Sequence, residues 1–240
     1  MSRFVRRVSA LATLLIALVV LGFQPVANAS TSYKVVPGIG RFVTPAGTSQ
    51  LIVVRSVSWR SSTATVIAYE KGSTGRWVQK FGPLTAHIGR NGMSVASQRH
   101  EGDGTTPAGS FALTTSFGRL ANPGTVMPYT KVTSYDYWVG DSASPYYNQM
   151  RSTIRGGFSR AQSEHLSAFG PVYDHALVID FNRPHAVPGR GSAIFLHITN
   201  GHTTAGCVAV SRRAVTAFLR WLQPAKHPRI VMGPAAWLAG

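Results

Sequence analysis

The sequence contains a single cysteine, Cys207, among its 240 residues. One cysteine cannot form an intrachain disulfide, so the fold must be stable from its core alone. An apolar content of 44% is ordinary for a globular protein with such a core. A lone thiol outside the cytoplasm is open to oxidation unless it is buried or used in chemistry. Cys207 is therefore a candidate functional residue, against the alternative that it is only a small buried apolar side chain.

Acidic residues are also scarce, with 8 Asp and Glu against 24 Lys and Arg and a net charge of +16. Three of the arginines lie in the leader described below, which lowers the net charge of the remaining chain by 3 to +13. A surface this basic favours polyanions such as nucleic acid, anionic lipid or anionic wall polymers. The basic residues are scattered rather than clustered, so basicity that only keeps the protein soluble remains an alternative, and no nucleic-acid partner is predicted.

Patterns typical of metal and cofactor sites are missing. The sequence has no His-Glu-x-x-His motif and no cysteine pair, and its eight histidines are dispersed. The glycine-rich segment 102–109 lacks the Gly-Lys-Ser/Thr ending of a phosphate loop, so a tight turn before a strand is predicted there. No metal and no cofactor are expected.

The first 29 residues have the pattern of a secretory signal peptide. Arg3, Arg6 and Arg7 precede an apolar run at 8–23, and Ala27-Asn28-Ala29 offers a cleavage site before Ser30. The run of about 16 residues is short for a membrane span of about 20. We predict an exported protein of the cell envelope, periplasmic or wall-associated, with no membrane span after cleavage. An extended lead-in at 30–49, one domain at 50–233 and a tail at 234–240 would follow.

The remaining pattern predicts a mainly β fold, a two-sheet or barrel-like domain with one C-terminal helix after Cys207. Strands are predicted at 51–54, 63–69, 76–81, 110–116, 176–181 and 229–232. Ser211 is a natural N-cap for the helix, because Val215, Phe218 and Leu219 follow at helical spacing before Pro224. The aromatic-rich segment 120–170 is irregular, which indicates a functional flap or a loop that covers the core.

The stretch 191–210 decides whether Cys207 can meet a histidine. Residues 194–199 alternate as a strand that carries His197, and a second short strand is predicted at 206–210. A tight hairpin at Asn200-Gly201 would place Cys207 opposite Ile194. A wider loop around His202 would place Cys207 directly opposite His197, with Cβ atoms about 5 Å apart. We predict the wider loop.

Several motifs in this order carry a resemblance to a known family. A histidine on a strand followed by Thr-Ala-Gly-Cys-Val at 204–208 resembles the active-site signature of the L,D-transpeptidase (YkuD-type) catalytic domain. The branch with Ala-Gly-Cys in place of His-Gly-Cys is the nearest in pattern. The segments 101–109, 137–148 and 189–197 also match, and the resemblance spans roughly 38–233, which makes 50–233 the expected catalytic domain.

The resemblance implies a role for each of several residues. Cys207 is the expected nucleophile and His197 the general base, while backbone N–H groups at Gly206 and Cys207 would hold the oxyanion. His202, the competing base, and Thr204 are expected to contact substrate.

Two positions depart from the family pattern. Ala205 stands where most relatives have a second histidine. The role of that histidine is therefore absent here or is taken by His202. Ala209 replaces the usual arginine, which leaves Arg190, Arg212 and Arg213 as alternatives for binding a substrate carboxylate.

The implied function is acyl transfer on peptidoglycan stem peptides through a Cys207 thioester. An L,D-carboxypeptidase would use the same groups with water as acceptor. A sortase-like transpeptidase fits less well, because sortases place their histidine far upstream of the cysteine and here the spacing is ten residues. The alternative outside enzymology is a catalytically silent basic module that binds cell wall.

Overall fold

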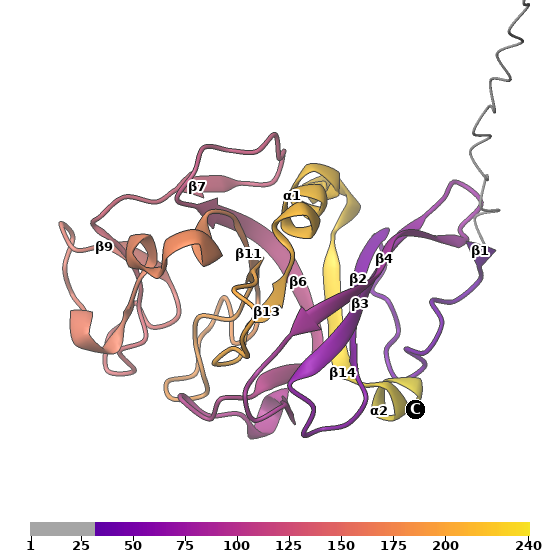
Figure 1. The fold of residues 1–240 in the computed structure, drawn as a ribbon, viewed down its shortest axis with the longest axis horizontal. Helices are drawn as coiled ribbons and strands as arrows, with labels where there is room; N and C mark the ends of the chain where they lie inside the picture. The colour runs from indigo at the N-terminus through magenta and orange to yellow at the C-terminus, as the bar shows by residue number, and fades with distance from the viewer. Residues whose placement is uncertain (1–31) are drawn as a thin grey trace, which may run out of the picture.

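The computed structural model describes residues 32–240, so the predicted signal peptide at 1–29 lies outside the described residues. Most strands join one eleven-stranded sheet (Figure 1). These strands are β1 (Ser32–Tyr33), β2 (Gln50–Ser56), β3 (Thr63–Lys71), β4 (Trp77–His87), β5 (Met93–Val95), β6 (Thr106–Gly118), β7 (Tyr129–Lys131), β11 (Ala176–Ile179), β12 (Phe195–Ile198), β13 (Val208–Val210) and β14 (Arg229–Pro234).

The sheet closes on itself. Strand β4 pairs with β3 on one side and with β13 on the other, and the order β4-β13-β12-β11-β6-β14-β2-β3 returns to β4. Closure leaves no long free edge in this ring of strands. The predicted mainly β, barrel-like fold is confirmed, including the β3–β4 hairpin.

The barrel interior is apolar because successive strand residues point to opposite faces. In β2, Ile52 and Val54 join the central core, while Leu51 and Val53 join a second cluster outside it. Each fully buried side chain of this size contributes about 1.5–3 kcal/mol relative to an exposed one. The alternation in a single strand therefore supports two cores.

The predicted C-terminal helix is present as α1 (Arg212–Trp221). The Ser211 hydroxyl caps it by accepting a hydrogen bond from the Ala214 N–H at 3.2 Å. Val215, Phe218 and Leu219 are buried in the central core. A second helix, α2 (Ala235–Ala239), follows β14 where a tail was predicted, because a five-residue helix is too short to show a periodic pattern.

The segment 120–170 is more ordered than predicted. It forms a three-stranded sheet of β8 (Asp136–Trp138), β9 (Met150–Ser152) and β10 (Glu164–His165). Residues 32–240 also contain the 3₁₀ segments η1 (Ala96–Gln98), η2 (Arg160–Gln162), η3 (Leu166–Tyr173) and η4 (Pro224–Lys226). The small sheet flanks the barrel on the side of β11 and β12, and η3 contacts β12 (Figure 1). Strands of two or three residues are too short for alternation to reveal them.

Candidate active site

The predicted antiparallel pairing of His197 with Cys207 is wrong. Strands β12 and β13 pair in parallel, and His197 lies opposite Ala209. The connecting segment doubles back along the end of β4 instead of forming a hairpin. Its Thr204 N–H donates to the Ile88 carbonyl at 2.9 Å, and the Arg90 N–H donates to the Thr204 carbonyl at 2.8 Å. These bonds satisfy backbone groups that a free loop would leave to water.

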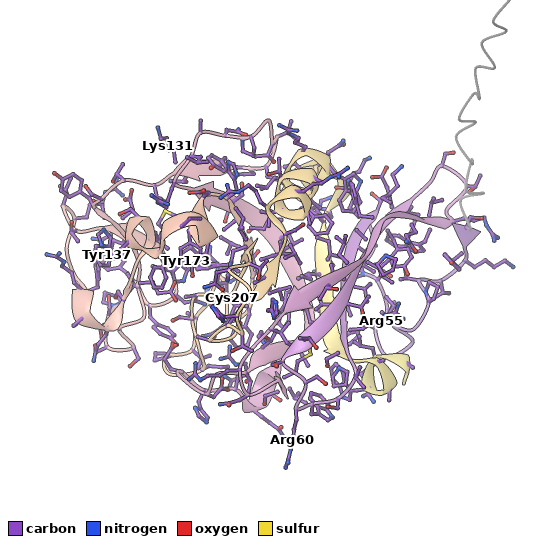
Figure 2. All side chains as sticks on the ribbon, viewed as in Figure 1. Arg55, Arg60, Lys131, Tyr137, Tyr173 and Cys207 are labelled. Carbon is purple, nitrogen blue, oxygen red and sulfur yellow. The ribbon has the colours of Figure 1, made fainter. Side chains whose placement is uncertain are left out.

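The two side chains nevertheless share a face. In the parallel register Leu196 lies opposite Val208, and both are buried in the central core. Cys207, one residue earlier, points the other way and packs in a third cluster with Phe195 and Tyr173. The His197 ring packs edge-on against the Tyr173 ring with centroids 5.3 Å apart. Tyr173 and Cys207 are both labelled in Figure 2, on the side of the barrel nearest the small sheet.

The Cys207 thiol is buried, with 6% of the residue exposed. Its Sγ donates to the Ala193 carbonyl at 3.3 Å and accepts from the Phe195 N–H at 3.4 Å. Burial raises the pKa of the thiol to about 12, and the nearby Glu164 carboxyl adds to the shift. The resting form at neutral pH is therefore the neutral thiol, and a base must remove its proton during attack.

His197 is held as a neutral imidazole. Its Nδ1 lies 2.9 Å from the Ile198 carbonyl oxygen, which can only accept, so Nδ1 carries the proton and Nε2 is left as the basic atom. Burial lowers the pKa of the imidazole. A neutral ring with an unprotonated Nε2 is the form that can accept a proton near neutral pH.

Thr204 holds the loop that presents Cys207. Its hydroxyl donates to the Cys207 carbonyl at 2.7 Å and accepts from the Gly206 N–H at 3.1 Å. The Gly206 N–H, an expected oxyanion donor, thus has an internal partner here. Gly206 has φ +150, and a Cβ on it would lie 2.8 Å from the Thr105 carbonyl oxygen. Glycine is required at this position for both reasons.

His202 lies exposed on the connecting segment, and its N–H donates to the Asn200 side chain at 3.1 Å. It does not line the cavity at Cys207, and neither do Thr204 and His197. His197 therefore shares the sheet face of the thiol, Thr204 bonds to the backbone of Gly206 and Cys207, and His202 lies at the solvent-facing surface.

A cavity of about 340 Å³ opens at the thiol. Sequence reasoning missed most of its wall, because the wall comes from segments far apart in the chain. The chemically distinctive lining residues are Arg99, Glu101, Trp138, Glu164, Ser192 and Cys207. The matching motifs at 101–109, 137–148, 189–197 and 204–208 contain four of these six residues, all but Arg99 and Glu164. The motifs therefore pointed to the right segments without giving the roles of the side chains.

Asn148 fixes the wall beside the sulfur. Its Oδ1 accepts from Trp138 Nε1 at 2.9 Å and from the Ala193 N–H at 3.2 Å. Its Nδ2 donates to the Phe181 carbonyl at 3.0 Å. The asparagine thus ties the small sheet to the residue whose carbonyl accepts the thiol hydrogen bond, which gives the Tyr-Trp to Tyr-Asn motif a physical role.

Arg99 is the charged group of the cavity with an unused donor. Its Nε and Nη2 bond to the Asp103 carboxylate, the shortest contact being 2.6 Å, and its side chain is only 3% exposed. Its Nη1 has no partner within residues 32–240. The guanidinium lies near enough to lower the pKa of Cys207, although burial outweighs this effect.

Two carboxyl groups line the same cavity. Glu164 Oε2 accepts from the Tyr173 hydroxyl at 2.8 Å, and Glu101 accepts from the Tyr147 hydroxyl. Burial raises the pKa of Glu164 to about 7, and the charge of Glu101 adds to this shift. Tyr173 also lies close enough to the thiol to lower its pKa, so it stands between Glu164 and Cys207.

The arginines proposed from the sequence for carboxylate binding do not line this cavity. Arg190, Arg212 and Arg213 are all absent from its wall, and Arg212 pairs with Asp174 at 2.7 Å. Ala209, at the usual arginine position, is 1% exposed and lies opposite His197. Position 209 therefore offers no charged side chain that could bind a substrate carboxylate.

Within residues 32–240, no three His, Cys, Asp or Glu side chains gather closely enough to hold a metal ion. No helix in this part of the chain is long and apolar enough to cross a membrane.

The comparisons with known proteins concern the domain that contains this site. Residues 60–231 match the family model of the YkuD L,D-transpeptidase catalytic domain. The match covers well over half of the chain, and the protein belongs to this family. No curated protein matches the chain significantly. Membership supports an L,D-transpeptidase-type function and implies peptidoglycan stem peptides as the substrate class.

Proposed function

We propose that this protein is an exported L,D-transpeptidase that transfers an acyl group from a peptidoglycan stem peptide through a Cys207 thioester. The observation that carries the proposal is the Cys207 thiol itself. It lines a polar cavity, shares a sheet face with a neutral His197, and lies within the matched catalytic domain.

In the acylation step, the Cys207 sulfur attacks the carbonyl of the L-centre at the third residue of a tetrapeptide stem. The thiol proton passes to Nε2 of His197, and the carbonyl becomes a tetrahedral oxyanion. The C–N bond then breaks, and His197 returns the proton to the leaving amine of D-alanine. The thiol pKa of about 12 means that attack and proton removal occur together, since almost no thiolate exists beforehand.

In the transfer step, an amine attacks the thioester carbonyl and the C–S bond breaks. His197 removes a proton from the attacking nitrogen and returns one to sulfur, which restores the thiol. Water as the acceptor would give an L,D-carboxypeptidase from the same groups. The backbone N–H of Cys207 is the proposed oxyanion donor, because the Gly206 N–H already donates to Thr204.

Product analysis tests the reaction. Mature protein, residues 30–240, is incubated with tetrapeptide muropeptides, and products are identified by mass spectrometry. Loss of D-alanine with a new cross-link supports transpeptidation, and loss of D-alanine alone supports the carboxypeptidase. Cys207→Ala should give neither product. A parent protein that forms no acyl-enzyme and releases no D-alanine would leave the silent wall-binding module as the better description.

Export and wall retention are tested separately. Envelope protein should begin at Ser30, and an intact leader on the exported pool would contradict the predicted cleavage. If the charge of +13 holds the protein on anionic wall polymers, binding to isolated walls should weaken steeply with salt, because exposed charges are screened beyond about 8 Å at physiological ionic strength. Salt-independent binding would assign the basicity to solubility alone.

A further inference from the structure

The cavity at Cys207 holds charges of both signs that the acylation chemistry does not use. The whole chain has only three glutamates, and two of them, Glu101 and Glu164, line this cavity. Arg99 lines it as well. Carboxyl groups beside the nucleophile are unexpected for two reasons. The chain has a net charge of +16 and few acidic residues, and the Glu164 charge raises the pKa of the thiol that must react. A ligand that needs these charges would account for them.

Arg99 indicates an anionic group on the ligand. Two of its nitrogens are fixed by Asp103, while Nη1 lacks a partner within the described residues although the side chain is 3% exposed. Nη1 lies 3.3 Å from the position that a Cβ on Gly191 would occupy. Gly191 directly precedes Ser192, which lines the cavity. Leaving a buried donor unpaired is costly, and a planar guanidinium with one free edge suits a carboxylate.

Glu164 indicates a cationic group on the same ligand. Its carboxyl and that of Glu101 lie close enough for like-charge repulsion. Tyr173 anchors the Glu164 carboxyl through one oxygen, which leaves the other carboxyl oxygen free to accept. An ammonium placed against Glu164 would relieve this repulsion, because an opposite charge within a few ångströms favours the ionised carboxylate.

We propose that this cavity is a binding site for an amino-acid headgroup, in which Arg99 binds the carboxylate and Glu164 binds the ammonium. The inference rests on the proposed function. Acylation expels an amine from the acyl carbonyl, and transfer adds an amine to the same carbonyl. The leaving amino acid and the incoming amine therefore occupy the same side of the thioester. Arg99 thereby takes the carboxylate-binding role that the alanine at position 209 cannot fill.

The transfer step balances with these groups. The incoming ammonium gives one proton to the Glu164 carboxylate, and the resulting amine attacks the thioester carbonyl. The C–S bond breaks and its electron pair goes to sulfur, while a second proton from nitrogen passes through His197 to the sulfur. The products are an amide, the Cys207 thiol and a protonated Glu164, which releases its proton to solvent.

Matched acceptors test the two charges. Cys207 is first acylated with a tetrapeptide donor at pH 7, where the amine of an amino-acid amide is mostly an ammonium, and transfer to D-methionine, D-methioninamide and hydroxylamine is followed by mass spectrometry. D-methionine carries both charges, its amide carries only the ammonium, and hydroxylamine is uncharged at this pH. The parent should prefer D-methionine over its amide by about tenfold or more, as expected for one charge-assisted hydrogen bond.

The variants separate the charges. Arg99→Lys keeps a cation but loses the free Nη1, and it should reduce the preference for D-methionine over its amide to less than about threefold. Glu164→Gln should slow transfer to both charged acceptors by about tenfold relative to transfer to hydroxylamine measured in the same variant. Arg229→Lys and Glu70→Gln are the matched controls, because both parent residues are partly buried, hydrogen-bonded and outside the cavity.

The outcomes distinguish this inference from the proposed function. An unchanged acceptor preference in Arg99→Lys and Glu164→Gln, with normal acylation of Cys207, overturns the headgroup site and leaves the transpeptidase standing. Failure of the parent to form the acyl-enzyme overturns the proposed function first. If a variant unfolds, the inference is tested on the parent protein instead, by measuring how well each ligand protects the Cys207 thiol from alkylation by iodoacetamide. N-acetyl-D-methionine and D-methioninamide should each protect less than D-methionine, and equal protection by all three overturns the inference.

Discussion

The role of His197 as the base can be tested through the pH dependence of Cys207 acylation. With a thiol pKa of about 12, only about 1 in 30,000 molecules would carry a thiolate at pH 7.5, against about 1 in 10 for an unperturbed thiol. The reaction therefore depends on proton removal during attack, which a positioned base typically accelerates by about 10²–10⁴-fold. His197→Ala should lower the acylation rate at pH 7.5 by that factor.

The shape of the pH profile carries more information than the single rate. In the parent the rate should fall as His197 becomes protonated, and burial lowers the pKa of this imidazole below its usual value of 6.5. Above that pH the parent rate should be flat except for a limb near pH 7 from Glu164, whose charge raises the pKa of the thiol. In His197→Ala the residual rate should instead rise about tenfold per pH unit towards the thiol pKa, because the thiolate becomes the only nucleophile.

The assay is acylation by a tetrapeptide donor between pH 5 and pH 10, followed by mass spectrometry of the intact protein. Glu164 lies in the same cavity with a pKa of about 7, so the profile is also measured in Glu164→Gln to separate its limb from that of His197. His202→Ala is the matched histidine control and should change the rate by less than about tenfold. Loss of the acidic limb in His202→Ala and its retention in His197→Ala would reverse the two assignments.

Three further predictions concern the structure around the site. Gly206→Ala should reduce acylation by more than about tenfold and lower the melting temperature, because its Cβ would lie 2.8 Å from a backbone oxygen at a φ that side chains rarely adopt; wild-type melting and rate would contradict this. Asp103→Asn should destabilise the fold at pH 7 by about 1–3 kcal/mol in denaturant titrations. Hydrogen bonds from Arg99 and the Thr105 N–H outweigh burial and hold the pKa of Asp103 at about 2, below its usual 3.8. The ionised Asp103 thus stabilises the fold above about pH 4, and this stabilisation is lost between about pH 4 and pH 2. A variant with the same unfolding free energy as the parent at pH 7 would refute the prediction. Ser211→Ala should cost about 1 kcal/mol through loss of the α1 cap, and equal unfolding midpoints would argue against that bond.

The fold class and the principal motif could be predicted from local pattern. Apolar and β-branched runs bounded by turn formers predicted β2, β3, β4 and β14, each a strand of six or more residues. The cap at Ser211 and the apolar spacing behind it identified α1. The single cysteine and its Thr-Ala-Gly-Cys-Val context identified the family, which the match over residues 60–231 then established. These features are local, so single segments carried enough information.

The tertiary structure decided how the site is assembled. The wider-loop prediction placed His197 and Cys207 on one face, but it assumed an antiparallel pair, and the alternation within each strand cannot tell a parallel pair from an antiparallel one. In the parallel arrangement the Thr204 N–H donates to the Ile88 carbonyl and the Thr204 carbonyl accepts from the Arg90 N–H, and both partners lie more than 100 residues earlier in the chain. The raised pKa of the thiol, the unpartnered Nη1 of Arg99 and the carboxyl of Glu164 likewise arise from burial and charge between distant segments. Such effects depend on distances in space, which no local pattern of residues contains.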